Sequence, residues 1–432
     1  MGRRLRVTLW AALVALLAVP AGVAFHSYGR PAARDAAAGA PDAARAPSWG
    51  LTHTKVTPDG AGAAARTGLG AVPIAQNQAI MGWGVDSPEP SPGRYDFAGL
   101  DARVRLVRDT GGIPVITLCC SPDWMKGGAA GTTDWAKLET APTAARYDDF
   151  AALAAQVARR YPDVRHYLVW NEFKGFFDEK AGTWDYAGYT ALYNKVYAAL
   201  KQVNPRIQVG GPYLPMNSNA PGKGPVTAVS GPWGSVDQRS LDAVAYWLQH
   251  KAGADFLAVD GSSLPEQTGV ATDEFAALAK FAAVTKWLNA QSQGRLPVWW
   301  AEWYVQPEGT SWTDEHLGAV QAAAMMQFVQ GGAAAAFYWS PQTGAAECKG
   351  CLWTGPDAGG APTPTLTMLQ NFARWFPPGT PLTPVTSSNA AVRVLGQKRQ
   401  LLAVNTSAKA ASSVVGGAKM DLGPYEVRWV NW

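Results

Sequence analysis

Short apolar runs alternate with helix-like segments along most of this chain. Several of the runs are apolar throughout, which is typical of strands that are buried on both faces of a parallel sheet. The expected strands lie at residues 48–54, 78–86, 113–120, 165–172, 207–214, 254–261, 296–304 and 333–340.

The segments between these runs carry apolar residues at helical spacing. In residues 147–162, for example, Phe150, Leu153 and Val157 fall on one face of a helix. The other expected helices lie at residues 97–112, 185–205, 273–291 and 316–332.

This alternation predicts an α/β fold with a (β/α)8 TIM barrel at residues 48–378, because eight strand–helix units fit within about 290 residues. A doubly wound open sheet is the alternative, but no glycine-rich phosphate loop follows the first run. Residues 379–432 contain only short β-type runs separated by turns. They predict a small C-terminal antiparallel domain resembling a β-sandwich.

The first 24 residues have the pattern of a secretory signal. Arginines precede an apolar stretch, and small residues follow it at Gly22, Val23 and Ala24. We expect residues 1–24 to be a signal peptide, with an uncleaved membrane anchor as the alternative, and residues 25–47 to be an Ala/Pro-rich linker. The mature protein would then be secreted or extracytoplasmic, or attached to a membrane by that anchor.

Charge and composition exclude several classes of partner. The chain has 432 residues and a formal charge of +4, and three of the positive charges lie in the first 24 residues, which contain no acid. Removing that segment lowers the charge to +1, and no cluster of cations follows, so we expect no nucleic-acid partner. The chain has five His and four Cys but neither an HExxH nor a paired CxxC motif, so we expect no metal site.

Two of the expected strands end in a glutamate. The run at 165–172 closes with Asn171 and Glu172, and the run at 296–304 contains Glu302 beside Trp303. Barrel enzymes carry their reactive side chains at the carboxyl ends of strands. One such glutamate is as readily explained as a structural charge, but the pair predicts two convergent carboxyl groups, as a retaining glycosidase requires.

Tryptophan is unusually common, with 19 residues in the chain. An indole ring offers a flat apolar face to a sugar ring and an N–H donor at its edge. Each tryptophan alone is as readily explained by packing, but together those at expected strand ends predict a carbohydrate cleft. They are Trp83, Trp124, Trp303 and Trp339.

Four stretches of the sequence resemble retaining glycoside hydrolases of clan A, which are (β/α)8 barrels. Residues 83–104 resemble the clan's second-strand segment, residues 116–125 its P-x-W loop, residues 168–172 its acid/base motif and residues 299–304 its nucleophile motif. The resemblance covers residues 48–430 and is greatest to glycoside hydrolase family 39, the β-xylosidase and α-L-iduronidase group.

This resemblance implies roles for individual residues. Glu172 would be the general acid/base and Glu302 the nucleophile, Asn171 would hold the sugar 2-hydroxyl, and Trp339 would form the floor of the −1 subsite. No cofactor is implied.

Three more residues are candidates for the same site. Tyr213 and Tyr304 are candidate partners of the nucleophile. His53, at the end of the first expected strand, is interpreted either as a sugar contact or as a packed histidine.

The sequence departs from the family at the sixth strand. Related enzymes carry a His-x-Tyr pair there, whereas this chain reads AVDGSS at residues 258–263. Asp260 occupies this position and is interpreted as a group that binds a hydroxyl or a cationic amino sugar, or as a cap of a helix or loop.

Export would allow the cysteines to form disulfides. Cys348 and Cys351 lie beside turn residues and are candidates for a small disulfide loop. The adjacent Cys119 and Cys120 are expected to be buried thiols, with a bridge from Cys120 to the later pair as the alternative. Four cysteines allow three full pairings, and the sequence does not choose among them.

Together these features predict an exported retaining glycoside hydrolase whose partner is a polysaccharide or oligosaccharide substrate. The alternative hypothesis is a non-catalytic carbohydrate-binding or cell-envelope protein on a degenerate barrel. That protein would keep the tryptophans and lose a carboxylate, so the presence of both glutamates argues against it. A third hypothesis is an enzyme of unrelated chemistry on the same barrel.

Overall fold

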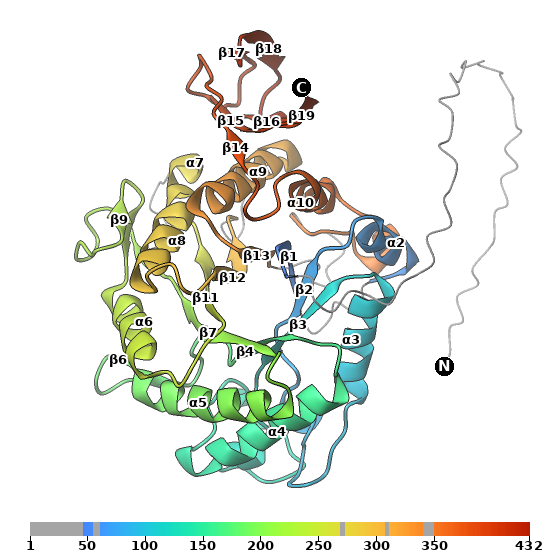
Figure 1. Cartoon of the computed structure of the whole chain (residues 1–432), viewed down its shortest axis with the longest axis vertical. Helices are drawn as coiled ribbons and strands as arrows, with labels where there is room; N and C mark the ends of the chain where they lie inside the picture. The colour runs from blue at the N-terminus through green and yellow to red at the C-terminus, as the bar shows by residue number, and fades with distance from the viewer. Residues whose placement is uncertain (1–45, 55–60, 268–272, 307–310, 340–349) are drawn as a thin grey trace, which may run out of the picture. The chain divides into compact units, whose positions relative to one another are not determined.

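The computed structural model describes residues 46–54, 61–267, 273–306, 311–339 and 350–432, so the expected signal peptide and most of the expected linker lie outside the described residues. Eight parallel strands form a closed barrel and follow one another around it in chain order (Figure 1). This confirms the expected barrel. The strands are β1 (Trp49–His53), β2 (Ala75–Gln78), β3 (Ile113–Leu118), β4 (His166–Val169), β7 (Gln208–Pro215), β11 (Phe256–Ser262), β12 (Val298–Tyr304) and β13 (Ala335–Tyr338).

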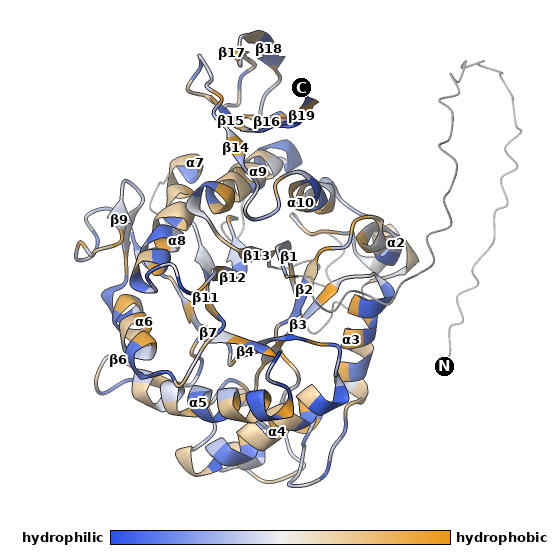
Figure 2. Ribbon diagram, in the orientation of Figure 1, coloured by the Kyte–Doolittle hydropathy of each residue, from blue (hydrophilic) through white to orange (hydrophobic). Residues whose placement is uncertain are grey.

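Helices follow the barrel strands along the chain and cover the outside of the barrel (Figure 1). The five expected helical segments are present, although the one at residues 273–291 is divided into α7 and α8, and α2, α6 and α10 are additional. Figure 2 shows hydrophobic and hydrophilic residues on different faces of α3 and α4, as amphipathic packing requires. The helices are α2 (Ala63–Ala71), α3 (Ala98–Asp109), α4 (Tyr147–Arg160), α5 (Tyr186–Val203), α6 (Gln238–His250), α7 (Glu274–Ala277), α8 (Ala279–Gln291), α9 (Asp314–Gly331) and α10 (Pro364–Trp375).

Local sequence explains where the helices begin and end. In α4, Asp148 and Asp149 lie in the first turn and Arg159 and Arg160 in the last turn, where these charges complement the helix dipole. At the end of α9, Gly332 adopts a left-handed φ of 79°, which glycine does without steric cost.

The expected position of the second strand is wrong. The run at residues 78–86 begins at the last residue of β2, and beyond it lie a loop and the 3-10 helix η1 (Gly84–Asp86). The strand itself reads AQNQ, and all four residues are buried. An apolar pattern could not reveal this strand, because most of its buried side chains are polar.

Hydrogen bonds compensate for burying these polar groups. Asn77 Nδ2 donates to Thr52 Oγ1 at 3.1 Å, and Thr117 Oγ1 donates to Asn77 Oδ1 at 3.0 Å. Gln76 Nε2 donates to Thr110 Oγ1 at 2.8 Å. A buried polar group without such a partner costs about 1–3 kcal/mol, so these bonds fix β2 between β1 and β3.

Trp299 lies at the centre of an apolar cluster formed by barrel strands. Its ring stacks on Phe256 with centroids 3.6 Å apart and meets Phe337 edge-on at 5.9 Å. The other members are small or aliphatic residues and Tyr213, so one large indole fills the space that they leave. The cluster comprises Ala75, Val115, Leu168, Tyr213, Phe256, Ala258, Trp299, Ala301, Ala335 and Phe337.

Antiparallel strands follow the barrel, as expected for the C-terminal segment. Trp429 packs edge-on against Phe372 of α10 at 5.2 Å, and Arg393 donates to the carbonyl of Phe275 at 2.9 Å. These contacts join the sheet to the outside of the barrel. One sheet contains β14 (Leu382–Thr383), β15 (Val392–Gln397), β16 (Gln400–Asn405) and β19 (Val427–Asn431), and a second pair contains β17 (Ala411–Val415) and β18 (Ala418–Leu422).

Within the described residues, none of the helices combines the length and the hydropathy that a bilayer-spanning segment requires.

Replacing Trp299 tests the packing of the barrel. We expect Trp299→Ala to lower the free energy of unfolding by about 3–5 kcal/mol, because the substitution leaves a large cavity. Urea denaturation followed by circular dichroism would measure this as a lower midpoint. The matched control is Trp135→Ala, because Trp135 is 69% exposed and its loss should change stability by about 0.5 kcal/mol or less. Equal midpoints for the two variants would contradict the assignment of Trp299 to the core.

Candidate active site

A cavity of about 350 Å³ opens at the carboxyl ends of the barrel strands. It is formed by residues that end or follow β1, β2, β4, β12 and β13, together with Glu139 from the segment between β3 and α4. The structure therefore brings together most of the residues that the sequence singled out. Those that line the cavity are His53, Trp83, Asn171, Glu172, Glu302, Tyr304 and Trp339.

Glu172 is aimed by a short segment with unusual backbone angles. β4 ends at Val169, and Trp170, Glu172 and Phe173 then adopt positive φ values of 67°, 51° and 54°. Such angles cost about 1–3 kcal/mol each for residues other than glycine. Trp170 helps to hold the segment, since its ring is fully buried and its Nε1 donates to the carbonyl of Lys174 at 2.7 Å.

Two polar side chains lie beside the Glu172 carboxylate. Lys174 Nζ lies 3.0 Å from Glu172 Oε2, and Asn171 Nδ2 donates to the same oxygen at 3.4 Å. Burial alone would lower the pKa of Lys174, but the charges of Glu172 and Glu139 hold it above its usual value. Lys174 is therefore a cation fixed next to Glu172.

Glu302 lies deeper in the cavity, on β12, and is only 6% exposed. The hydroxyl of Tyr213 donates to Glu302 Oε1 at 2.7 Å. Burial, and then the nearby charge of Glu172, raise the pKa of Glu302 to about 8, whereas Tyr213 and Lys174 act to lower it. The Tyr213 hydrogen bond and the Lys174 charge thus favour the ionised form that burial disfavours.

Asp260 is a third carboxyl group in this cluster. It lies on β11 opposite Glu302 in the strand pairing, is 1% exposed, and shares a hydrogen bond with Glu172. Burial and the two glutamates raise the pKa of Asp260 well above its usual value. Two carboxyl groups can share a hydrogen bond only when one of them is protonated, so this arrangement retains a proton.

His53 lines the cavity as a neutral base. Its Nε2 lies 2.8 Å from Gln76 Oε1, and burial lowers its pKa to about 4. Its position combines the two interpretations of the sequence, because the ring is buried and also borders the cavity.

The four expected tryptophans divide into two pairs. Trp83 and Trp339 line the cavity, and Trp339 is 40% exposed with its ring 5.8 Å from that of Tyr304. Trp303 is fully buried against Phe328, and Trp124 is buried with its Nε1 donating to the carbonyl of Glu89. The structure therefore places Trp124 and Trp303 in the packing around the site, away from the cavity lining.

Sequence reasoning missed two charged residues of the cavity wall. Lys174 and Glu139 both line it, and Lys174 Nζ donates to Glu139 Oε1 at 2.7 Å. Lys174 lies two residues after Glu172, so its proximity was a usable signal. Glu139 lies in the long segment between β3 and α4, where the sequence has no comparable pattern.

The cysteines differ from one expectation. Cys119 and Cys120 are buried as expected, but they form a disulfide with each other and are not thiols. The two cysteines directly follow β3, and the backbone N–H of Met81 donates to the carbonyl of Cys119 at 2.6 Å. Cys351 is also disulfide-bonded, and Cys348 lies outside the described residues.

The described residues contain no cluster of three or more His, Cys, Asp or Glu side chains that could hold a metal ion.

Comparison with known proteins gives structural relatives only. No family model matches the chain, and no curated protein matches its sequence. Three of the similar solved structures are a glucosidase from Croceicoccus marinus, a family 39 β-xylosidase from Caulobacter crescentus and an endo-β-1,4-mannanase from Thermotoga petrophila. Their sequence identities of 15%, 17% and 14% establish similarity of fold alone.

The structural similarity extends over most of each chain. The glucosidase matches with a TM-score of 0.55 over 88% of this chain and 81% of its own. The xylosidase has a TM-score of 0.51 over 84% and 79%, and the mannanase a TM-score of 0.51 over 89% and 91%. These values confirm the barrel fold that the resemblance implied.

The raised pKa of Glu302 predicts how stability depends on pH. An unfolded glutamate titrates near pH 4.3, whereas Glu302 in the folded protein titrates near 8. Between these values the folded state binds more protons than the unfolded state, so raising the pH through this window destabilises the protein. Because Glu302→Gln cannot ionise, we expect it to denature at a temperature about 2 °C or more above the parent chain at pH 9, with no such advantage below pH 5.

Thermal denaturation between pH 5 and pH 9 would measure this difference. Glu179→Gln is the matched control, because Glu179 is exposed and its variant should follow the parent chain at every pH. A constant difference between Glu302→Gln and the parent chain over this range would show that Glu302 does not carry the buried charge.

Proposed function

We propose that this chain is an exported retaining glycoside hydrolase that cleaves O-glycosidic bonds in a polysaccharide or oligosaccharide. The observation that carries the proposal is that Glu302, held by the Tyr213 hydroxyl, faces the same cavity as Glu172. Two carboxyl groups in one barrel mouth suit double displacement at a sugar carbon. The structural relatives named as a glucosidase, a xylosidase and a mannanase support this substrate class, and the N-terminal pattern supports export.

In the first step, Glu302 attacks the anomeric carbon and Glu172 gives its proton to the leaving oxygen. The bond from carbon to the leaving oxygen breaks as the bond from carbon to Glu302 forms, and the leaving sugar departs as an alcohol. In the second step, Glu172 takes a proton from water, which attacks the same carbon and releases Glu302. Two inversions at one carbon retain its configuration.

The charges of the cluster suit this division of roles. Tyr213 and Lys174 both favour the ionised form of Glu302, which is the form that attacks. Asp260 shares a hydrogen bond with Glu172, so a proton is held beside the group that must donate one. Paired carboxyl groups in different environments commonly assume different roles.

Other side chains of the cavity suit a sugar ring. The partly exposed indole of Trp339 offers a flat apolar face. Asn171 Oδ1 is buried and has no hydrogen-bond partner among the described residues, so a sugar hydroxyl that donates to it would satisfy a polar atom that is costly to leave unpaired.

Replacing each glutamate tests the mechanism directly. We expect Glu172→Gln and Glu302→Gln each to lower kcat/KM by about 10³-fold or more on the same substrate, because each removes one of the two reacting groups. Release of reducing ends from a broad panel of polysaccharides and oligosaccharides would identify the substrate and measure the loss, with Glu179→Gln as the control. Full activity in either glutamate variant would show that its role is misassigned, and sugar binding without turnover in the parent chain would favour a binding protein.

Replacing Tyr213 tests its bond to the nucleophile. We expect Tyr213→Phe to lower kcat/KM by about 10–100-fold, in the range typical of a lost hydrogen bond to a reacting group. The acidic limb of the pH profile should also move to higher pH, since the Tyr213 hydrogen bond lowers the pKa of Glu302. The control is Tyr304→Phe, which alters another tyrosine of the cavity and leaves the Tyr213–Glu302 bond intact. An acidic limb that stays in place in Tyr213→Phe would refute this role.

A further inference from the structure

A second cavity adjoins the candidate active site. It has a volume of about 370 Å³, and Trp83 and Glu139 line both cavities. Its own lining adds Trp135 and Leu138, from the segment between β3 and α4, and Gly175, which follows Glu172 by three residues. Because the two cavities share side chains, a chain of linked sugars that fills the first has a direct path into the second.

The second cavity lies on the Glu172 side of the site. Lys174 Nζ lies 2.7 Å from Glu139 Oε1 and 3.0 Å from Glu172 Oε2. Glu139, which lines both cavities, is therefore linked to the proposed acid through Lys174. None of Glu172, Glu302 and Trp339 lines the second cavity, but Gly175, which does, lies three residues after Glu172, whereas no residue of β12 or β13 lines it. In a retaining glycosidase the acid protonates the leaving oxygen, so sugar units that extend past Glu172 belong to the leaving group.

Trp135 gives the second cavity an aromatic face. It begins the 3-10 helix η3 (Trp135–Lys137), and 69% of its surface is exposed. A lone exposed apolar side chain is ordinary on a protein surface, but this indole borders a cavity that another tryptophan, Trp83, also lines. Two indoles that line one cavity next to a proposed glycosidase active site suit the apolar C–H faces of a sugar ring.

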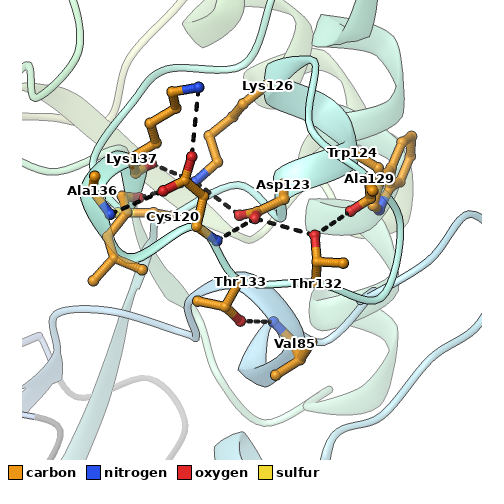
Figure 3. Close-up of polar contacts among 12 residues, drawn as sticks. Val85, Cys120, Asp123, Trp124, Lys126, Ala129, Thr132, Thr133, Ala136 and Lys137 are labelled. Carbon is orange, nitrogen blue, oxygen red and sulfur yellow. Dashed lines mark hydrogen bonds and ion pairs between the residues drawn. The ribbon is translucent and has the colours of Figure 1, made fainter.

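The segment that carries Trp135 is held by a buried carboxylate (Figure 3). Asp123 is 3% exposed, accepts a hydrogen bond from the backbone N–H of Asp134, and lies 3.5 Å from Lys126 Nζ. Lys126 Nζ in turn donates to the carbonyl of Lys137 at 2.8 Å. These contacts hold the backbone at Asp134 and Lys137, which flank Trp135 in the sequence. The fold therefore fixes the exposed position of Trp135 in the absence of a ligand.

A further hydrogen bond joins the segments of the two tryptophans. The backbone N–H of Val85 donates to Thr133 Oγ1 at 2.9 Å (Figure 3). Val85 lies two residues after Trp83, and Thr133 lies two residues before Trp135. The two indoles therefore lie on loops that a hydrogen bond joins. Such contacts between loops preorganise a binding site.

We propose that Trp135 and Trp83 form a subsite for a sugar unit on the leaving-group side of the cleaved bond. This inference rests on the proposed glycosidase function and assigns the binding of its leaving sugar to two residues outside the pair of glutamates. A glycoside with a small leaving group would leave this subsite empty.

The test compares Trp135→Ala with the parent chain on two kinds of substrate. One is the glycosyl fluoride of the sugar that the panel identifies, whose leaving group is a single atom, and the other is the set of its tri- to hexasaccharides. We expect kcat/KM to fall about 10–100-fold on the oligosaccharides and to change less than about twofold on the fluoride. Trp135→Phe, which keeps an aromatic face, should recover most of the loss.

Two results would overturn the proposal. One is an equal effect of Trp135→Ala on the fluoride and the oligosaccharides, with an unchanged denaturation midpoint to exclude misfolding. The other is a loss on a disaccharide fluoride that exceeds the loss on the monosaccharide fluoride, because Trp135 would then contact the sugar that stays on the enzyme. Failure of the glycosidase function itself has a different signature, since the parent chain would then turn over neither the fluorides nor the oligosaccharides.

Discussion

Three carboxyl groups lie close together in one barrel mouth, and the burial of two of them is the constraint on which the site depends. Glu302 and Asp260 are almost completely shielded from water, and with Glu172 so close, a charge on one member raises the cost of a charge on the others. Tyr213 and Lys174 partly offset that cost at Glu302. The cluster therefore holds protons at pH values where isolated carboxyl groups would have lost them, which is what the proposed division into an acid and a nucleophile requires.

Packing and hydrogen bonds in the rest of the barrel hold the three carboxyl groups in position. Trp299 and Phe256 fill the interior, and the hydrogen-bonded side chains of β2 close the sheet between β1 and β3. Among the described residues other than glycine, six have a positive φ, and four of these lie beside or within the site, namely Trp170, Glu172, Phe173 and Tyr213. Strain at such positions persists only where the surrounding packing fixes the chain, and the buried rings of Trp170 and Tyr213 belong to that packing.

Sequence patterns predicted the barrel and the pair of glutamates because both leave a local signal in the sequence. The signal is a short apolar run for each strand and a glutamate at the end of two of these runs. They misplaced β2, because most of its buried side chains are polar. Hydrogen bonds to other strands compensate for the burial of these polar groups. They could not separate Trp339, which borders the cavity, from Trp303, which faces the helices. The register of β12 shifts between Trp300 and Trp303, so simple alternation along the strand does not give the direction of Trp303. Trp135 gave no signal, since its position depends on a loop that is held by a hydrogen bond to Asp123.

In the proposed mechanism, Glu302 forms the covalent bond to sugar while Glu172 serves as acid and base. The most direct measurement is mass spectrometry of the protein after reaction with 2-deoxy-2-fluoro glycosyl fluorides of glucose, xylose and mannose, which slow the release of a covalent sugar. We expect one sugar per chain on the peptide that contains Glu302, and none in Glu302→Gln. A sugar attached to Glu172 or Asp260, or hydrolysis with no covalent intermediate and with inverted configuration, would contradict the proposed mechanism.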